Sequence, residues 1–229
     1  MMIYDDDFIL EDDSLVLGID EAGRGSVLGP LVVGAVLVPR KKLRFLKRMG
    51  VKDSKKLTSK RRTVIARKIK KLTTFTTRII PAEKIDEMRL NSINLNQIET
   101  NAMEDIIGEL MPDACIIDCI ESNEDKFTET IEEFIKTIQK PDMPIQIMTK
   151  HKADEKYDIV SAASIIAKTT RDKELEKIRS EYGKLGSGYP SDPVTRNYLK
   201  TLDEDNYPWF VRKTWNTIDS IQHENHEEK

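Results

Sequence analysis

Cysteine, histidine and long apolar runs are all scarce in this 229-residue sequence. Cys115 and Cys119 are its only cysteines, too few for a disulfide framework or a structural zinc site, so we expect small buried residues kept reduced. No apolar stretch approaches the ~18 residues that would cross a bilayer, and the first residues lack the basic start and apolar run of a secretory signal. These absences predict a cytoplasmic protein.

Charge is distributed unevenly along the chain. The net charge of −3 argues against a protein that coats nucleic acid through bulk charge. Between Arg40 and Leu72, however, sixteen Lys and Arg residues face a single acid, Asp53. A basic run of this kind is typical of a solvated helix face and also of a nucleic-acid surface. It indicates nucleic-acid binding only if an active site accompanies it.

The order of predicted strands and helices indicates an α/β fold with a mixed sheet. Three consecutive strands are predicted first, and strands then alternate with helices. The helices have good N-caps, namely Thr58 or Ser59, Asn94, and Asp192 followed by Pro193. The strands are predicted at 15–19, 30–38, 73–80, 114–119 and 144–148, and the main helices at 59–72, 95–110, 124–138 and 159–182.

The chain has no internal repeat and no low-complexity linker. We expect one catalytic domain over residues 1–185 and a C-terminal helical region over 186–221 that carries Tyr207, Trp209 and Trp215 onto the core. A disordered acidic tail is expected over 222–229.

Four carboxylates stand where a buried charge needs a partner. Asp20 and Glu21 end the first predicted strand, and Asp118 interrupts the apolar segment ACIIDCI. Asp154 lies just before a long helix that begins with small residues. Adjacent acids are common on surfaces, but an ionised carboxylate in a buried strand is costly unless it is paired or bound to metal. Four oxygen ligands without a histidine suit Mg²⁺ or Mn²⁺.

A glycine-rich segment, GRGSVLGP at Gly23–Pro30, separates the first two strands. Glycines let backbone N–H groups approach a sugar or phosphate closely, and the guanidinium of Arg24 adds a positive charge with several hydrogen-bond donors. A plain turn that needs positive φ is the alternative, and the glycine spacing alone does not decide between them. Lys168 and Arg171 share a helix face, which fits either a phosphate contact or solvated charges.

Four blocks of sequence together resemble ribonuclease HII of the archaeal kind. They occur in that family's order and spacing from about Leu15 to Trp215. They are GIDEAGRGSVLGPLVVGAVLV, VKDSKKLT, HKAD with VSAASIIAKTTRD, and GSGYPSDP. The resemblance implies a ribonuclease H-like fold, a mixed β-sheet flanked by helices with a helical C-terminal region.

The resemblance also assigns roles to individual residues. Asp20, Glu21, Asp118 and Asp154 match the four metal ligands. Gly23, Arg24 and Gly25 match the motif whose backbone contacts the ribose 2′-OH. Tyr189 matches a tyrosine that stacks near the RNA-to-DNA junction. Lys55 and Lys56 match a block associated with phosphate contacts.

The implied activity is that of a metal-dependent endoribonuclease. It would cut the RNA strand of RNA–DNA hybrids and DNA duplexes at embedded ribonucleotides. Two Mg²⁺ or Mn²⁺ ions would act, and the products would carry 5′-phosphate and 3′-hydroxyl ends. A monomer is expected. Binding to a sliding clamp is left open, since the tail shows no clear glutamine-led motif that would predict it.

Two alternatives to this activity can be weighed on the sequence. A ribonuclease HIII usually carries an extra N-terminal domain, whereas about 14 residues precede the first predicted strand here. An inactive nucleic-acid-binding module of the same fold is expected to have lost at least one acid, and all four are present.

Overall fold

The computed structural model describes residues 8–52, 57–139, 144–203 and 205–227. Two compact units are interleaved along the chain. Among the described residues, unit 1 holds 8–22, 33–78 and 99–169, and unit 2 holds 23–32, 79–98 and 170–227. Each unit is built from three separate segments of the chain, and the expected division at residue 185 stays a prediction. Four elements begin in one unit and end in the other: β2 (Leu31–Pro39), β3 (Thr74–Ile80), α5 (Leu95–Leu110) and α8 (Asp158–Tyr182).

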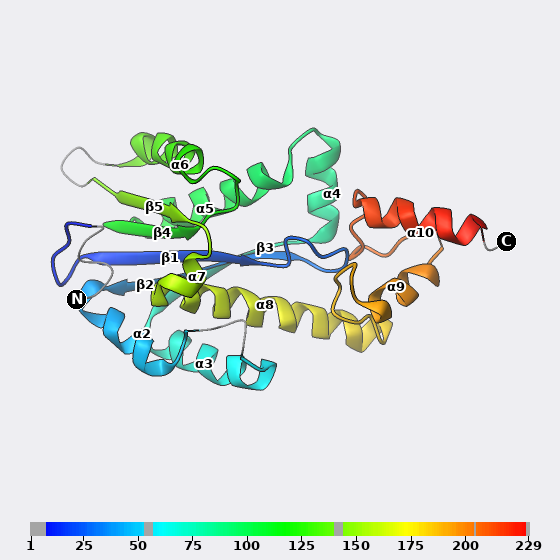
Figure 1. Cartoon of the computed structure of the whole chain (residues 1–229), viewed down its shortest axis with the longest axis horizontal. Helices are drawn as coiled ribbons and strands as arrows, with labels where there is room; N and C mark the ends of the chain where they lie inside the picture. The colour runs from blue at the N-terminus through cyan, green and yellow to red at the C-terminus, as the bar shows by residue number, and fades with distance from the viewer. Residues whose placement is uncertain (1–7, 53–56, 140–143, 204, 228–229) are drawn as a thin grey trace. The chain divides into compact units, whose positions relative to one another are not determined.

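The five strands form one mixed sheet, as the sequence predicted, and their order in the sheet is β3-β2-β1-β4-β5 (Figure 1). Strand β1 runs parallel to β4, with Val16 opposite Ala114 and Ile19 opposite Ile117, and β4 runs parallel to β5. Because parallel strands end at the same edge of a sheet, the residues after Ile19 and Ile117 are brought together. The bounds of these strands are β1 Leu15–Ala22, β4 Ala114–Asp118 and β5 Gln146–Lys150.

Several helices begin at the expected caps. The Thr58 side chain accepts a hydrogen bond from the backbone of Arg61 at 3.3 Å, at the start of α3 (Ser59–Leu72). Asn94 and Gln97 exchange side-chain-to-backbone bonds of 3.0 Å at the start of α5, which is a reciprocal capping pair. Asp192 caps α9 (Pro193–Lys200). The α6 helix (Glu124–Ile138) has the predicted bounds.

Other elements differ from the expectation. Strand β1 continues to Ala22, and β5 lies two residues later than predicted because its pairing with β4 begins at Gln146. Helix α10 (Asn216–Glu227) includes residues that were expected to form a tail without regular structure; buried Ile218 and Ile221 anchor it. Short elements not predicted are η1 (Arg40–Lys42), α2 (Leu43–Met49), α4 (Ala82–Leu90) and α7 (Ala153–Lys156).

Each unit has its own apolar core. In unit 1 the buried faces of β1, β2 and β4 pack with α2, α3 and the first part of α8. In unit 2 one cluster joins the 27–28 segment to the end of α8, to α9 and to α10, and a smaller one joins Leu31 to Ile85 and Ile98. No helix in the described residues is long and apolar enough to span a membrane.

Glycine lets α8 lie directly against the sheet in unit 1. A Cβ atom on Gly18 would lie 2.6 Å from the backbone carbon and oxygen of Ile159, and one on Gly34 would lie 2.7 Å from the backbone nitrogen of Ala167. Backbone atoms at these distances have little room to shift. The closeness of α8 to β1 and β2 therefore depends on these two glycines.

We predict that Gly18→Ala lowers the free energy of unfolding by about 1–3 kcal/mol or more, because the added methyl overpacks this contact. The matched control is Gly108→Ala in α5, where the new Cβ meets only Phe134 at an ordinary 3.7 Å. Removing a helix-interior glycine there is expected to stabilise by roughly 0.5–1 kcal/mol. Denaturant unfolding measures both, and equal effects would contradict the packing argument.

Candidate functional site

Three of the four predicted acids come together in unit 1. One carboxylate oxygen each from Asp20, Glu21 and Asp118 lies within 4.8 Å of the other two. Asp20 and Glu21 belong to the end of β1, and Asp118 is the last residue of β4. The parallel register explains the meeting, since Asp20 and Asp118 each follow the paired Ile19 and Ile117.

The cluster is electrostatically strained. Burial raises the pKa of Asp20 well above its usual value, and the neighbouring charges of Glu21 and Asp118 raise it further. A hydrogen bond from Ser164 and the ammonium of Lys168 act in the opposite direction. Lys168 donates to the Ser164 hydroxyl at 2.7 Å. A cation placed among the three carboxylates would relieve this repulsion, and the all-oxygen donor set suits Mg²⁺ or Mn²⁺.

Asp154 is buried in the same unit but is not a member of the group of three. It lies in the first turn of α7, and the backbone N–H of the preceding Ala153 donates to Oδ1 of Asp118 at 2.7 Å. Lys152, just before α7, adopts the left-handed conformation with φ of 56°, which is uncommon for a residue with a side chain. A strained turn thus brings the helix that carries Asp154 up to Asp118.

The Gly23–Pro30 loop belongs to unit 2. Gly23 has φ of +87°, and a Cβ there would lie 2.4 Å from Nε of Arg171, so this position requires glycine. Gly25 has neither restriction: its φ is not positive, and no described atom would lie within 4 Å of a Cβ added there. A glycine that the fold does not need is consistent with close approach of a ligand.

Tyr189 lies in a second loop of unit 2 that is bonded to the first. The carbonyl of Gly188 accepts hydrogen bonds from the backbone N–H groups of Val27 at 2.8 Å and Leu28 at 3.1 Å. The Tyr189 side chain is partly exposed, and the guanidinium of Arg171 lies 4.9 Å from its ring centroid. Arg171 is buried and donates to the carbonyl of Ser187. It supports the two loops and is not a solvated helix charge.

A second buried arginine, Arg212, was missed by the sequence reasoning. Its side chain is fully buried, and it donates to the carbonyls of Gly29 at 3.1 Å and Arg24 at 2.9 Å. Burial, and then the nearby charge of Arg171, lower the pKa of Arg212 to about 9, so it stays protonated at neutral pH. The only sequence signal was a pair of basic residues, Arg212 and Lys213, between the apolar residues of FVRKTW.

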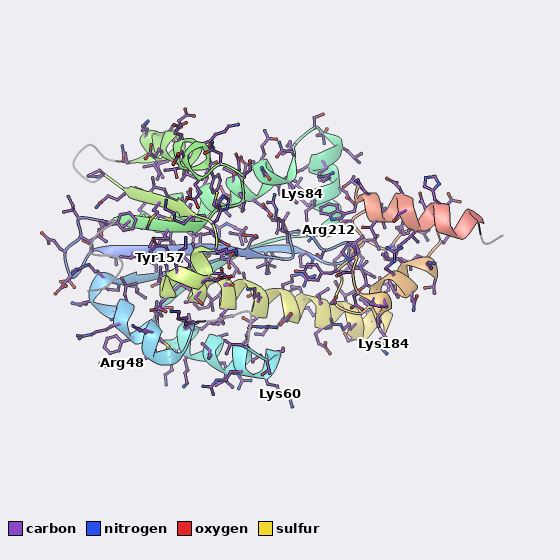
Figure 2. The ribbon with its side chains drawn as sticks, in the orientation of Figure 1. Arg48, Lys60, Lys84, Tyr157, Lys184 and Arg212 are labelled. Atoms are coloured by element: carbon purple, nitrogen blue, oxygen red, sulfur yellow. The ribbon has the colours of Figure 1, made fainter. Side chains whose placement is uncertain are left out.

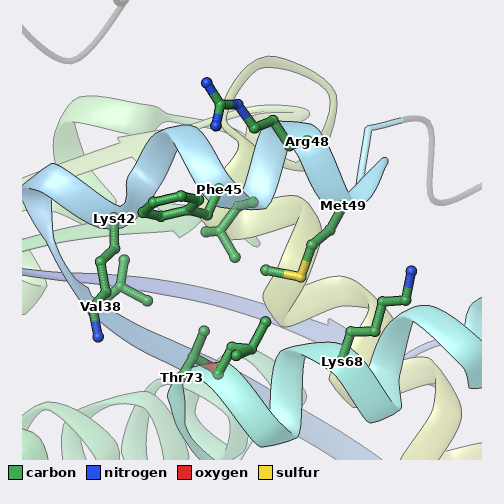
Figure 3. A pocket seen from close by; sticks show the side chains of 9 residues that line it. Val38, Lys42, Phe45, Arg48, Met49, Lys68 and Thr73 are labelled. Carbon is green, nitrogen blue, oxygen red and sulfur yellow. The ribbon is translucent and has the colours of Figure 1, made fainter.

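The remaining predicted residues give less information. Lys55 and Lys56 lie outside the described residues. The basic run forms η1, α2 and α3, and these helices border a cavity of about 370 Å³ (Figure 3). Its lining combines apolar residues such as Leu46 and Met49 with Lys42, Arg48 and Lys68. Because no carboxylate occurs among its described lining residues, this cavity does not offer the chemistry of the acidic cluster.

Comparison with known proteins decides the family. The family model described as Ribonuclease HII matches residues 17–218. The chain belongs to the ribonuclease HII family. A ribonuclease HII of Methanosphaera stadtmanae is 59% identical over 213 residues, covering 93% of this chain and 97% of the relative. One from Methanobrevibacter smithii is 46% identical, covering 90% and 98%.

Solved structures agree with this assignment. The ribonuclease H2 of Pyrococcus horikoshii OT3 matches with a TM-score of 0.83 at 35% identity, covering 93% of this chain and 99% of that one. The ribonuclease HII in a PCNA complex from Archaeoglobus fulgidus matches with 0.81 at 36%, covering 90% and 96%. Bst-RNase HIII shares the fold with a TM-score of 0.76 at 19% identity. As a ribonuclease HII family member with the ribonuclease H-like fold, the chain is a metal-dependent endoribonuclease.

The acidic cluster leads to a prediction for Asp118→Asn in this ribonuclease HII chain. The change removes one charge from the group of three, so the melting temperature without metal should stay equal or rise. Added Mg²⁺ or Mn²⁺ should raise the melting temperature of the wild type and not that of the variant. Cleavage should fall by at least about a hundredfold. Glu129→Gln, an exposed change on α6, is the control and should behave as the wild type. A metal-dependent stabilisation that survives Asp118→Asn would remove Asp118 from the metal site.

Arg212 leads to a second prediction. A lysine at this position keeps the charge, but its ammonium cannot reproduce the planar guanidinium, which donates hydrogen bonds to the carbonyls of both Arg24 and Gly29. We expect Arg212→Lys to lower the free energy of unfolding by about 1–3 kcal/mol, since a buried carbonyl loses its donor. Lys184→Arg, an exposed charge-conserving change in the same unit (Figure 2), should have almost no effect. Equal stabilities in thermal unfolding would show that Arg212 does not brace the loop.

Proposed function

We propose that this enzyme hydrolyses the RNA strand of RNA–DNA hybrids and cuts duplex DNA at embedded ribonucleotides. The observation that carries the proposal is the meeting of Asp20, Glu21 and Asp118 at the ends of two parallel strands, in a chain of the ribonuclease HII family. We propose that Asp154 completes the ligand set, because α7 places it one residue from the backbone group that bonds Asp118.

Two divalent ions, Mg²⁺ or Mn²⁺, would activate the attacking water and stabilise the leaving 3′-oxygen, giving 5′-phosphate and 3′-hydroxyl products. The chain's own residues set the conditions for this step. The carboxylates of Asp20 and Asp118 are held in place by Ser164 and by the backbone N–H of Ala153. Lys168 bonds Ser164 and keeps a positive charge near Asp20.

Recognition of the ribonucleotide is assigned to the loops of unit 2. The carbonyl of Gly23 accepts bonds from Ser26, and that of Arg24 accepts from Arg212. These acceptors are therefore occupied, and we propose that backbone N–H groups of Gly23, Arg24 and Gly25 contact the 2′-oxygen. Tyr189, braced by Arg171, would stack on the sugar or base at the RNA-to-DNA junction.

The nucleic-acid duplex is the proposed partner, and the enzyme is proposed to act as a monomer. A sliding clamp is a further candidate, because a relative of 36% identity was solved in complex with PCNA. The deciding experiment is cleavage of a DNA duplex that contains one ribonucleotide, with analysis of the product ends. A cyclic phosphate end would contradict the mechanism, and absence of cleavage with either metal would identify an inactive binding module.

Tyr189→Ala should impair cleavage at a single embedded ribonucleotide more than cleavage of a long RNA–DNA hybrid. Base–aromatic stacking contributes on the order of 1–3 kcal/mol, and a uniform hybrid offers many registers, so one lost junction contact matters less there. The measurement is kcat/KM on both substrates, with Tyr189→Phe as the control that keeps the ring. Equal losses on the two substrates would mean that Tyr189 only shapes its loop.

A further inference from the structure

Unit 2 contains a cavity of about 440 Å³ beside the Gly23–Pro30 loop. We infer that this cavity is a subsite for a backbone phosphate of the nucleic-acid substrate. The inference rests on the proposed function, because it assumes that the loop contacts a nucleic acid. The residues that line the cavity are Arg24, Gly25, Arg89, Leu95, Thr214, Trp215, Asn216 and Thr217.

The charged residues that line the cavity are of one sign. Arg24 and Arg89 line it, and its described lining residues include no acid. Arg212 lies behind one wall, with its guanidinium 4.8 Å from the ring centroid of Trp215. The carboxylate of buried Asp86 lies near the same wall. It accepts hydrogen bonds from the backbone N–H groups of Lys213 and Thr214 and from the Thr214 hydroxyl. The lining therefore favours an anion.

Both lining arginines are held in place. Arg24 donates to Oδ1 of Asn96 at 2.6 Å. Arg89 donates to the Thr214 hydroxyl at 2.9 Å and to its carbonyl at 3.4 Å, and its guanidinium lies 5.0 Å from the ring centroid of Trp215. Side chains that are already ordered lose little entropy when a ligand arrives. Surface arginines that merely keep a protein soluble have no need of such anchoring.

The rest of the lining fits the sugar–phosphate backbone in particular. Leu95 and Trp215 supply an apolar wall that suits the carbon face of a sugar, and Asn216 and Thr217 supply polar groups from the first turn of α10. Gly25 also lines the cavity and has no side chain that could fill it. A phosphodiester next to the ribonucleotide would thus meet cations and hydroxyls on one side and apolar surface on the other.

The first test uses Arg89→Gln, with Lys84→Gln as the matched control. Lys84 lies on the same helix, is exposed and pairs with Glu87, and does not line the cavity (Figure 2). Binding of a duplex with one ribonucleotide is measured without divalent metal over a range of salt. Arg89→Gln should weaken binding on the order of tenfold and lower the salt slope by about one. Lys84→Gln should change neither, and an equal effect of the two variants would overturn the subsite.

A second variant separates binding from folding. Asn216→Asp places a carboxylate at the first position of α10, where a negative charge stabilises a helix. Its melting temperature should therefore be maintained or raised, while binding should weaken at least as much as in Arg89→Gln because the cavity now repels a phosphate. Unchanged affinity in Asn216→Asp would contradict the inference even if Arg89→Gln failed to fold.

Methylphosphonate substitution then identifies the phosphate. Each backbone phosphate near the ribonucleotide is made neutral in turn, and binding to wild type and to Arg89→Gln is compared in a double-mutant cycle. One position should weaken binding to the wild type and have no further effect on the variant. If the wild type cleaves the duplex but no position shows this coupling, the subsite is wrong and the proposed function stands. If the wild type does not cleave, the proposed function itself fails.

Discussion

Repulsion among carboxylates is the constraint on which the chemistry of unit 1 depends. Asp20 and Asp118 follow paired positions of two parallel strands, so the sheet cannot let them separate without breaking its register. Ser164, Lys168 and the N–H of Ala153 offset the charge only in part, since the pKa of buried Asp20 remains raised. A divalent cation would relieve the same repulsion more completely, which supports the proposal that these carboxylates are its ligands.

Unit 2 is organised around charge of the opposite sign. Arg171 and Arg212 are buried, and their guanidiniums bond mainly to backbone carbonyls of the two loops that carry Gly23–Gly25 and Tyr189. Burying a cation is costly, and each arginine offsets the cost by satisfying carbonyls that the loops would otherwise leave without donors. The result is a pair of loops with fixed backbones and a positive field, which suits recognition of a sugar–phosphate chain.

The parts of this fold that depend on local signals could be predicted from the sequence. Caps at Thr58 and Asn94 begin helices where expected, because capping joins near neighbours in the chain. The convergence of Asp20 and Asp118 likewise follows from two apolar strands that each end in an acid. Long-range contacts could not be predicted: pairing with β4 sets the limits of β5, and Arg212 bonds residues more than 180 positions away. The interleaving of the two units has the same origin, since four continuous elements begin in one unit and end in the other.

In the proposed function, the separation of anionic and cationic groups also separates reaction from specificity. In the proposed function the carboxylates would hold divalent ions that contact phosphate oxygens and water, and the group of three offers no donor that could distinguish ribose from deoxyribose. Discrimination must come from groups that sense the 2′-oxygen, and the glycine loop and Tyr189 belong to unit 2. Gly23 follows Glu21 by two positions, so the proposed metal ligands and the proposed recognition loop are almost adjacent in the sequence. If these proposed roles hold, substitutions in unit 2 change which phosphodiester is cut while the bond-breaking chemistry of unit 1 stays the same.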